Sequence, residues 1–200
     1  MEDWCRRDVL KCGAALGTGS LALATSTGVQ AAPGGEEWTY EPGSRVSSPT
    51  VVDGTVFIGS YDSNTHLYAV DAATGEQQWA FETGPVVSSP AVVDGTVFAG
   101  GIDGNLYAVD AATGEQQWAS RTGDVMWASP AVVDGSVFVG DLAGNLHAVD
   151  AATGDRRWIF ETGDRVESSP AVVDGTVFIG SNDTHLYAVD AVSGERQWAF

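Results

Sequence analysis

The chain has 200 residues and a formal net charge of −18, with 27 Asp and Glu against 9 Lys and Arg. This acidic excess leaves no basic stripe to neutralise phosphates, which excludes nucleic acid as a partner. At molar salt the Debye length is about 3 Å, so self-repulsion is screened while the carboxylates keep the surface hydrated. The composition therefore favours a halophilic source, a haloarchaeon being the simplest, over an ordinary acidic secreted protein.

The first 31 residues have the features of an export signal. Arg6 and Arg7 precede Val-Leu-Lys and a run rich in Gly, Ala and Thr, a pattern that resembles a twin-arginine signal peptide. The run is too polar for a stable membrane span, which needs about 20 predominantly apolar residues. We expect cleavage after Ala31 and an extracellular or cell-surface location. Cys5 and Cys12 leave with the signal, so the mature chain has no disulfide and no cysteine ligand.

A unit of about 40 residues then recurs four times, a period typical of proteins built from one supersecondary motif. It is marked by an Asp-Gly pair that begins at Asp53, Asp94, Asp134 and Asp174. We expect a linker and leading outer strand over 32–43, followed by four units over 44–82, 83–121, 122–161 and 162–200.

Side-chain character alternates with period two in each unit, and this pattern predicts four short strands. In the first unit they cover 50–52, 55–59, 66–70 and 78–81. Asp53-Gly54 predicts a tight two-residue hairpin, and Gly75 supplies a left-handed residue for the turn before the last strand. Four antiparallel strands in 40 residues predict an all-β fold made of β-propeller blades. A helical solenoid is excluded, because Val, Phe, Thr and Tyr alternate where a 3.6-residue stripe would be required.

The segments AVDAATGEQQWAF, AVDAATGEQQWAS, AVDAATGDRRWIF and AVDAVSGERQWAF resemble the tryptophan repeat of quinoprotein alcohol dehydrogenases and of the related BamB family. The resemblance implies that the tryptophan packs flat between adjacent blades and that Asp and Gly fix the turn beneath it. Two departures are Ser193 in place of Thr and Ser120 in place of Phe. The motif residues are Asp71, Gly75, Trp79, Asp110, Gly114, Trp118, Asp150, Gly154, Trp158, Asp190, Gly194 and Trp198.

The number of blades departs from the family, whose members close rings of about eight. Four blades make half of an eight-bladed ring or an open arc, and residues 37–41 look like the final strand of a preceding blade. An open arc exposes strand edges, so two copies could complete the ring by self-association. The alternatives are a truncated or split gene product and a compact four-blade ring.

Comparison of the units with one another separates scaffold from candidate site. The Asp-Gly and Thr-Gly turns are nearly invariant, whereas the loops and inter-blade connections at the other end of the strands vary. Trp127 could form a stacking platform there, and three histidines suggest a metal, although a structural role is favoured. Acidic loops fall short of a complete calcium loop, and Asn182 begins a glycosylation sequon. The candidate binding face comprises Arg45, His66, Trp127, His147, Glu167 and His185.

The resemblance leaves two functions open. One is a non-catalytic scaffold that binds a protein or small ligand, BamB-like in character and without a cofactor. The other is a dehydrogenase, or a fragment of one, that uses pyrroloquinoline quinone and calcium. We favour the scaffold, because the mature chain has no lysine for the quinone carboxylates and no cysteine for a disulfide stacked on the cofactor. Fold analogy carries the assignment no further.

Overall fold

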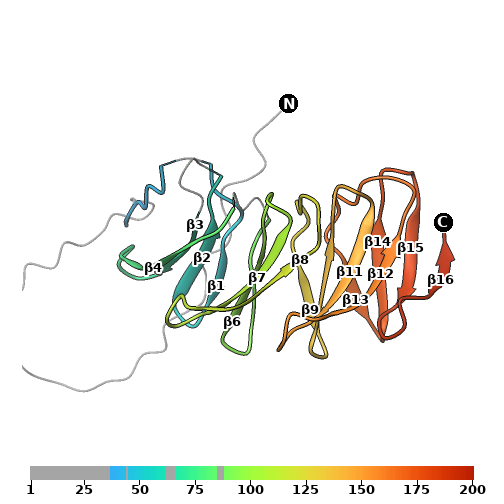
Figure 1. Cartoon of the computed structure of the whole chain (residues 1–200). Coiled ribbons are helices and arrows are strands. Elements are labelled where there is room, and N and C mark those ends of the chain that lie inside the picture. The colour runs from blue at the N-terminus through green and yellow to red at the C-terminus, as the bar shows by residue number, and fades with distance from the viewer. Residues whose placement is uncertain (1–36, 44, 62–65, 85–87) are drawn as a thin grey trace, which may run out of the picture. The chain divides into compact units, whose positions relative to one another are not determined.

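The computed structural model describes residues 37–43, 45–61, 66–84 and 88–200 (Figure 1). The signal peptide predicted over residues 1–31, with Arg6, Arg7 and Ala31, lies outside the described residues. From Trp38 to Phe200 the described residues form one unit, which contains sixteen strands. The predicted all-β fold with four antiparallel strands per blade is confirmed.

Each repeat folds into one sheet whose strands pair in chain order. The first sheet comprises β1 (Thr50–Val52), β2 (Thr55–Gly59), β3 (His66–Asp71) and β4 (Gln77–Glu82). The second comprises β5 (Ala91–Val93), β6 (Thr96–Gly100), β7 (Asn105–Asp110) and β8 (Gln116–Arg121). The third comprises β9 (Ala131–Val133), β10 (Ser136–Gly140), β11 (Asn145–Asp150) and β12 (Arg156–Glu161). The fourth comprises β13 (Ala171–Val173), β14 (Thr176–Gly180), β15 (Leu186–Asp190) and β16 (Arg196–Ala199).

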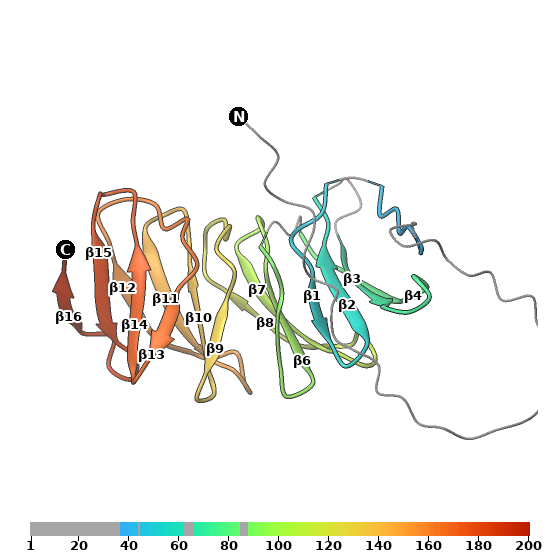
Figure 2. The same cartoon turned by 180° about the vertical axis from the view of Figure 1, so that it is seen from behind.

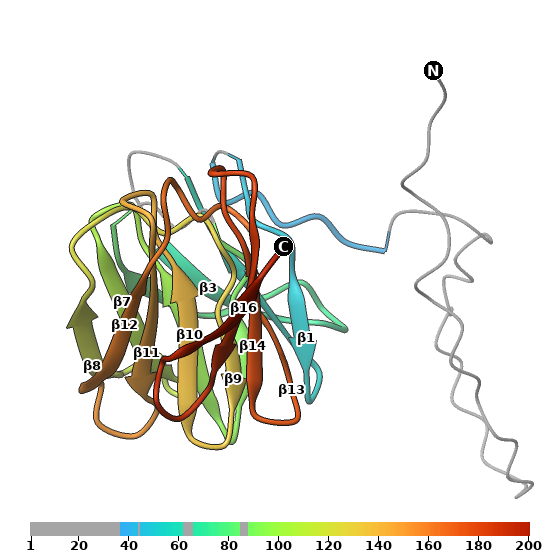
Figure 3. The same cartoon turned by 90° about the vertical axis from the view of Figure 1, so that its right-hand side faces the viewer.

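The sheets stand side by side in a row, with the first and fourth at its two ends (Figures 1 and 2). Figure 3 faces the fourth sheet, where β16 lies nearest the viewer. The four blades therefore form an open arc, and the compact four-blade ring considered from the sequence is not observed.

The hairpin between the first two strands of each blade has the predicted two-residue turn. Asp53 and Gly54 have φ of 48° and 76°, and the Asp-Gly pairs of the other blades repeat these positive values. Two consecutive residues with positive φ define the turn whose twist matches that of the flanking strands. Asp tolerates this backbone region better than most residues other than Gly, which accounts for its recurrence.

The hydrophobic core lies between the blades. At the first interface Phe57, Leu67 and Trp79 pack against Val97 and Val109 of the next blade, and the two later interfaces repeat the arrangement. Each sheet thus buries one face against the preceding blade and the other against the following one, as expected for stacked repeats.

A tryptophan and a glycine meet at the centre of each interface. The Trp79 indole nitrogen donates a hydrogen bond of 2.9 Å to the carbonyl of Ala111. Its ring lies over Gly114, where a Cβ atom would come within 2.8 Å of the indole carbons. Trp118 and Trp158 make the same two contacts with Ala151 and Ala191 and with Gly154 and Gly194.

Residues 37–41 differ from the prediction, because they are not assigned to a strand and have no neighbouring strand in the described chain to pair with. Trp38 nevertheless occupies the tryptophan position on the first blade. Its indole nitrogen donates to the carbonyl of Ala72 at 3.1 Å, and its ring lies over Gly75.

Replacing Gly114 with Ala should destabilise the protein through two separable effects. The left-handed φ of 74° costs an alanine about 1–2 kcal/mol, and the contact with Trp79 adds about 1–3 kcal/mol of overpacking. Gly95→Ala is the matched control, since Gly95 has the same φ but no atom within 4 Å of its Cβ position. Urea unfolding of the two variants measures the difference, and equal losses of stability would contradict a tight indole contact at Gly114.

Candidate functional site

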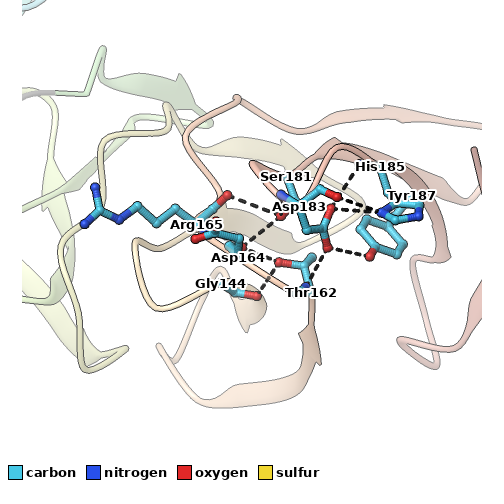
Figure 4. Close-up of polar contacts among 9 residues, drawn as sticks. Gly144, Thr162, Asp164, Arg165, Ser181, Asp183, His185 and Tyr187 are labelled. Carbon is cyan, nitrogen blue, oxygen red and sulfur yellow. Dashed lines mark hydrogen bonds and ion pairs between the residues drawn. The ribbon is translucent and has the colours of Figure 1, made fainter.

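At the variable end of the blades, an aspartate in the loop of the fourth blade hydrogen-bonds to the segment that follows the third blade. In the fourth blade, Asp183 accepts hydrogen bonds from the Tyr187 hydroxyl at 2.6 Å and from the amide of His185 at 3.0 Å (Figure 4). It also accepts one of 2.6 Å from the amide of Gly163, which lies shortly after β12, the last strand of the third sheet. The carboxylate therefore joins the loop of the fourth blade to the segment that follows the third.

A second set of contacts reinforces the same joint. The Thr162 hydroxyl donates to the carbonyl of Gly144 at 2.8 Å, and the Ser181 hydroxyl donates to that of Asp164 at 2.8 Å (Figure 4). Desolvation raises the pKa of Asp183, but the hydrogen bonds from Tyr187, Gly163 and His185 outweigh it and hold this pKa well below its ordinary value. A carboxylate that accepts several hydrogen bonds and has a lowered pKa is a poor general base.

The second blade has the same arrangement, in which Asp103 accepts hydrogen bonds from the Tyr107 hydroxyl and from the side-chain amide of Asn105. Burial, followed by the hydrogen bond to Asp103, raises the pKa of Tyr107. Sequence comparison of the units missed these aspartate-tyrosine pairs, although the fixed spacing from Asp103 to Tyr107 and from Asp183 to Tyr187 is a signal that could have found them.

The third blade replaces this pair with a buried aspartate and histidine. Asp141 Oδ2 lies 2.7 Å from His147 Nε2, and both side chains are excluded from solvent. The carboxylate also accepts from the backbone amide of Asn145 at 2.7 Å and from its side-chain amide at 3.0 Å. Asp141 lies six residues before His147, whereas Asp103 and Asp183 each lie four residues before their tyrosine. Within the described part of the chain, His147 Nδ1 is a buried nitrogen without a hydrogen-bond partner.

Ser120 and His147, which stand where the other blades have Phe and Tyr, both lie at the interface between the second and third blades. The other interfaces have an edge-to-face aromatic pair there: Phe81 with Tyr107 at 5.7 Å and Phe160 with Tyr187 at 5.3 Å between ring centroids. Strand register puts Ser120 and His147 at the corresponding positions. This joint is therefore polar where its neighbours are aromatic.

At the opposite end of the blades, the aspartates of the resemblance motif cap their own turns. Asp71 Oδ1 accepts hydrogen bonds from the amides of Ala73 and Thr74 at 2.9 and 2.8 Å, and these bonds lower its pKa. Asp110, Asp150 and Asp190 do the same in the later blades, and a hydrogen bond from Arg157 contributes most to lowering the pKa of Asp150 to about 2. These carboxylates stabilise turns.

The residues of the predicted binding face fall into two groups. Arg45, Trp127, Glu167 and His185 are exposed, and the Trp127 side chain is 45% accessible to solvent. His66 is half-buried and stacks on Tyr68, whereas His147 is buried inside the third blade. The three histidines are therefore not brought together. Among the described residues, no group of three or more His, Cys, Asp or Glu side chains is placed to hold a metal ion.

The described residues also include no helix of the length and hydropathy needed to cross a bilayer.

Four-stranded blades joined by tryptophan and glycine define the chain as a β-propeller protein of the PQQ-repeat class. A family model described as outer membrane protein assembly factor BamB matches residues 13–124 and 102–200. The chain belongs to this family. Among proteins with curated descriptions, none matches the chain significantly.

Solved structures share the fold at low sequence identity. A quinohemoprotein alcohol dehydrogenase from Pseudomonas putida HK5 superposes with a TM-score of 0.68 and 24% identity, over 77% of this chain and 33% of that protein. BamB from Moraxella catarrhalis gives 0.66 and 24%, over 76% and 47%. The chain thus spans between a third and a half of these two natural structures. The computationally designed Ika4 protein gives 0.70 and 19%, over 78% of this chain and 98% of that one.

Replacing Asp141 with Asn should lower the free energy of unfolding at pH 7 by about 1–3 kcal/mol, because an amide group then faces the donors of Asn145 or His147. Asp103→Asn is the control and should cost less, since Asp103 is exposed to solvent. Hydrogen bonds from His147 and Asn145 overcome desolvation and lower the pKa of Asp141 from its ordinary value of 3.8.

A carboxyl with a lowered pKa in the folded state stabilises the protein above its unfolded-state pKa, and this contribution disappears as the pH falls through the folded-state value. The difference in stability between the wild type and Asp141→Asn should therefore narrow as the pH falls below the ordinary pKa of 3.8. Urea unfolding at a series of pH values measures it, and a difference that stays constant as the pH falls would contradict this role.

Proposed function

We propose that the chain is an exported PQQ-repeat β-propeller that acts as a non-catalytic scaffold, with its variable loop end as the binding face. The observation that carries the proposal is the exposure of Trp127. Its side chain is 45% accessible, whereas the interface tryptophans Trp79 and Trp118 are 8% accessible. Tryptophan is enriched where proteins bind one another, and a large exposed aromatic side chain on a structured connection is a typical anchor.

The surroundings of Trp127 support the same function. Trp127 lies in the connection between the second and third blades, and Val46 and Glu167 occupy the corresponding position in two other connections. Val46 is 49% accessible, so the binding face also offers an apolar side chain beside the first blade. The acidic Glu167 changes the chemistry from one connection to the next, and this variation on a constant frame is what a specific binding face requires.

The carboxylates at both ends of the strands also favour a scaffold over a dehydrogenase. Asp183 and Asp103 accept hydrogen bonds at the loop end, and Asp71 and its equivalents accept them in the turns. A dehydrogenase of the quinoprotein type would need a free base and a set of oxygen ligands for calcium. In the described part of the chain, no three Asp, Glu, His or Cys side chains lie close enough together to share a metal ion.

Titration of the protein with pyrroloquinoline quinone and calcium in molar salt separates the two functions. The scaffold predicts no saturable binding of the quinone by absorbance and no dye-linked oxidation of alcohols or glucose. Stoichiometric binding together with dye reduction would overturn the proposal in favour of the dehydrogenase.

Site-specific cross-linking tests the binding face directly. A photo-reactive phenylalanine analogue is placed at Trp127 and, as the control, at Val173, which is 57% accessible and lies beside an Asp-Gly turn at the opposite end. In the cells that produce the protein, we expect a discrete adduct from position 127 and none from position 173. Equal yields at both positions, or no adduct at position 127, would contradict the assigned face.

A further inference from the structure

The first blade has a binding position for a tryptophan, and that position is filled from within the chain. At the three internal interfaces the indole nitrogen donates to an alanine carbonyl at 2.9, 3.0 and 3.1 Å. Trp38 makes the same bond to Ala72 at 3.1 Å and lies over Gly75. Trp38 thus occupies the position that the tryptophan of a preceding blade would take.

The segment around Trp38 makes further contacts with the first blade. The Tyr40 hydroxyl donates to the side chain of Gln77 at 2.6 Å, and the Tyr40 ring meets Tyr68 edge to face at 5.6 Å. Burial, followed by the proximity of Tyr68, raises the pKa of Tyr40 to about 12. Residues 37–41 form no strand, so the segment lacks the backbone ladder that holds the other interface tryptophans.

Beside this segment the interface is incomplete. An apolar cavity of about 170 Å³ opens there, lined by Trp38, Tyr40, Pro42, Val46, Val56, Ile58 and Val70. In the second blade the residues that correspond to Val56, Ile58 and Val70 are completely buried, because Phe57, Leu67 and Ala69 of the first blade cover them. In the first blade Ile58 and Val70 are also buried, because Trp38 and Tyr40 pack against them, and the cavity remains beside these two aromatic side chains.

The fourth blade presents the side chains that correspond to Phe57 and Leu67 on its outer face. Phe178 packs against Trp198 with 5.9 Å between ring centroids, as Phe57 packs against Trp79 at 5.8 Å. Leu186 is 41% accessible, whereas its equivalents Leu67, Leu106 and Leu146 are fully buried. Trp198 is 45% accessible, and among the described residues its indole nitrogen has no carbonyl acceptor.

We propose that the outer face of the fourth blade binds the first blade of a second copy of this chain, and that Trp198 replaces Trp38 over Gly75. The two faces are the two halves of an interface that the chain already forms three times. Trp198 displaces Trp38 because it arrives with Phe178 and Leu186, which fill the cavity that Trp38 leaves open. Trp38 therefore competes with Trp198 of the second copy for the position over Gly75, and it covers the first blade until that copy binds.

The geometry also gives the stoichiometry. The 200-residue chain has one donor face and one acceptor face, so a dimer with twofold symmetry satisfies both pairs of faces. Each chain carries a charge of −18, so association should strengthen with salt. This inference does not depend on what the loop face binds.

The test measures the molar mass of the 200-residue chain and its variants by sedimentation velocity, between dilute buffer and molar salt. The wild type should form dimers in a concentration-dependent manner at molar salt, and Trp198→Ala should weaken the dimer at least tenfold. Trp38→Ala should strengthen it, because the competitor is removed. Val192→Ala, at an exposed position of a turn, is the control and should behave as the wild type.

Three results would overturn the proposal. They are a monomer at every salt concentration for both the wild type and Trp38→Ala, a dimer that Trp198→Ala leaves unchanged, and a dimer that Trp38→Ala weakens as much as Trp198→Ala does. The last result would make the Trp38 segment part of the contact instead of its competitor.

A mixing experiment keeps the test independent of the stability of any one variant. Trp198→Ala removes the donor, and Gly75→Ala blocks the acceptor, since its Cβ would lie 2.7 Å from the indole that binds there. Neither variant should self-associate, but an equimolar mixture should form a 1:1 complex through the one intact pair of faces. Absence of that complex up to the solubility limit would also overturn the proposal, whereas circular dichroism of each variant checks its fold.

Discussion

The structure depends on the contact between a tryptophan ring and a glycine on the next sheet. A single four-stranded sheet of this length has two apolar faces and cannot bury either alone. The indole at Trp79 closes the gap because it is large and flat, and Gly114 accepts it because it has no Cβ. The hydrogen bond from the indole to the carbonyl of Ala111 orients the ring on the next blade. The other contacts between blades, which are the aromatic pairs and the hydrogen bonds of the loop aspartates, form on sheets that this contact has already brought together.

The fold was predictable because its determinants are local and repeated. Period-two alternation gave the strands, and Asp53-Gly54 gave the hairpin, since only a few residue types adopt two consecutive positive φ values. Residues 37–41 show the limit of this reasoning. Their sequence matches that of a strand, but a strand needs a neighbour, and the neighbour is absent from the described chain.

The candidate site was less predictable, because its contacts join residues that are distant in sequence. Ser120 was recognised as a departure from the motif and His147 as part of the binding face, yet the strand register shows that the two residues face the same interface. His147 was placed on the binding face with His66 and His185, but it stands in the tyrosine column and points into the protein beside Asp141. The exposure of Trp127 was expected from its loop position, since connections between blades run over the surface.

Every joint uses the same contact between a tryptophan and a glycine, so the main determinant of the boundary is shared by the 40-residue modules. The glycines are Gly75, Gly114, Gly154 and Gly194, and the tryptophan of the preceding segment packs over each of them in the same way. Unequal recombination between such modules would add or remove whole units and keep this contact at every remaining boundary. Length variation in steps of one blade is therefore an inexpensive evolutionary route for this architecture, whereas any change at one of these glycines would have to be matched by a change in the facing ring.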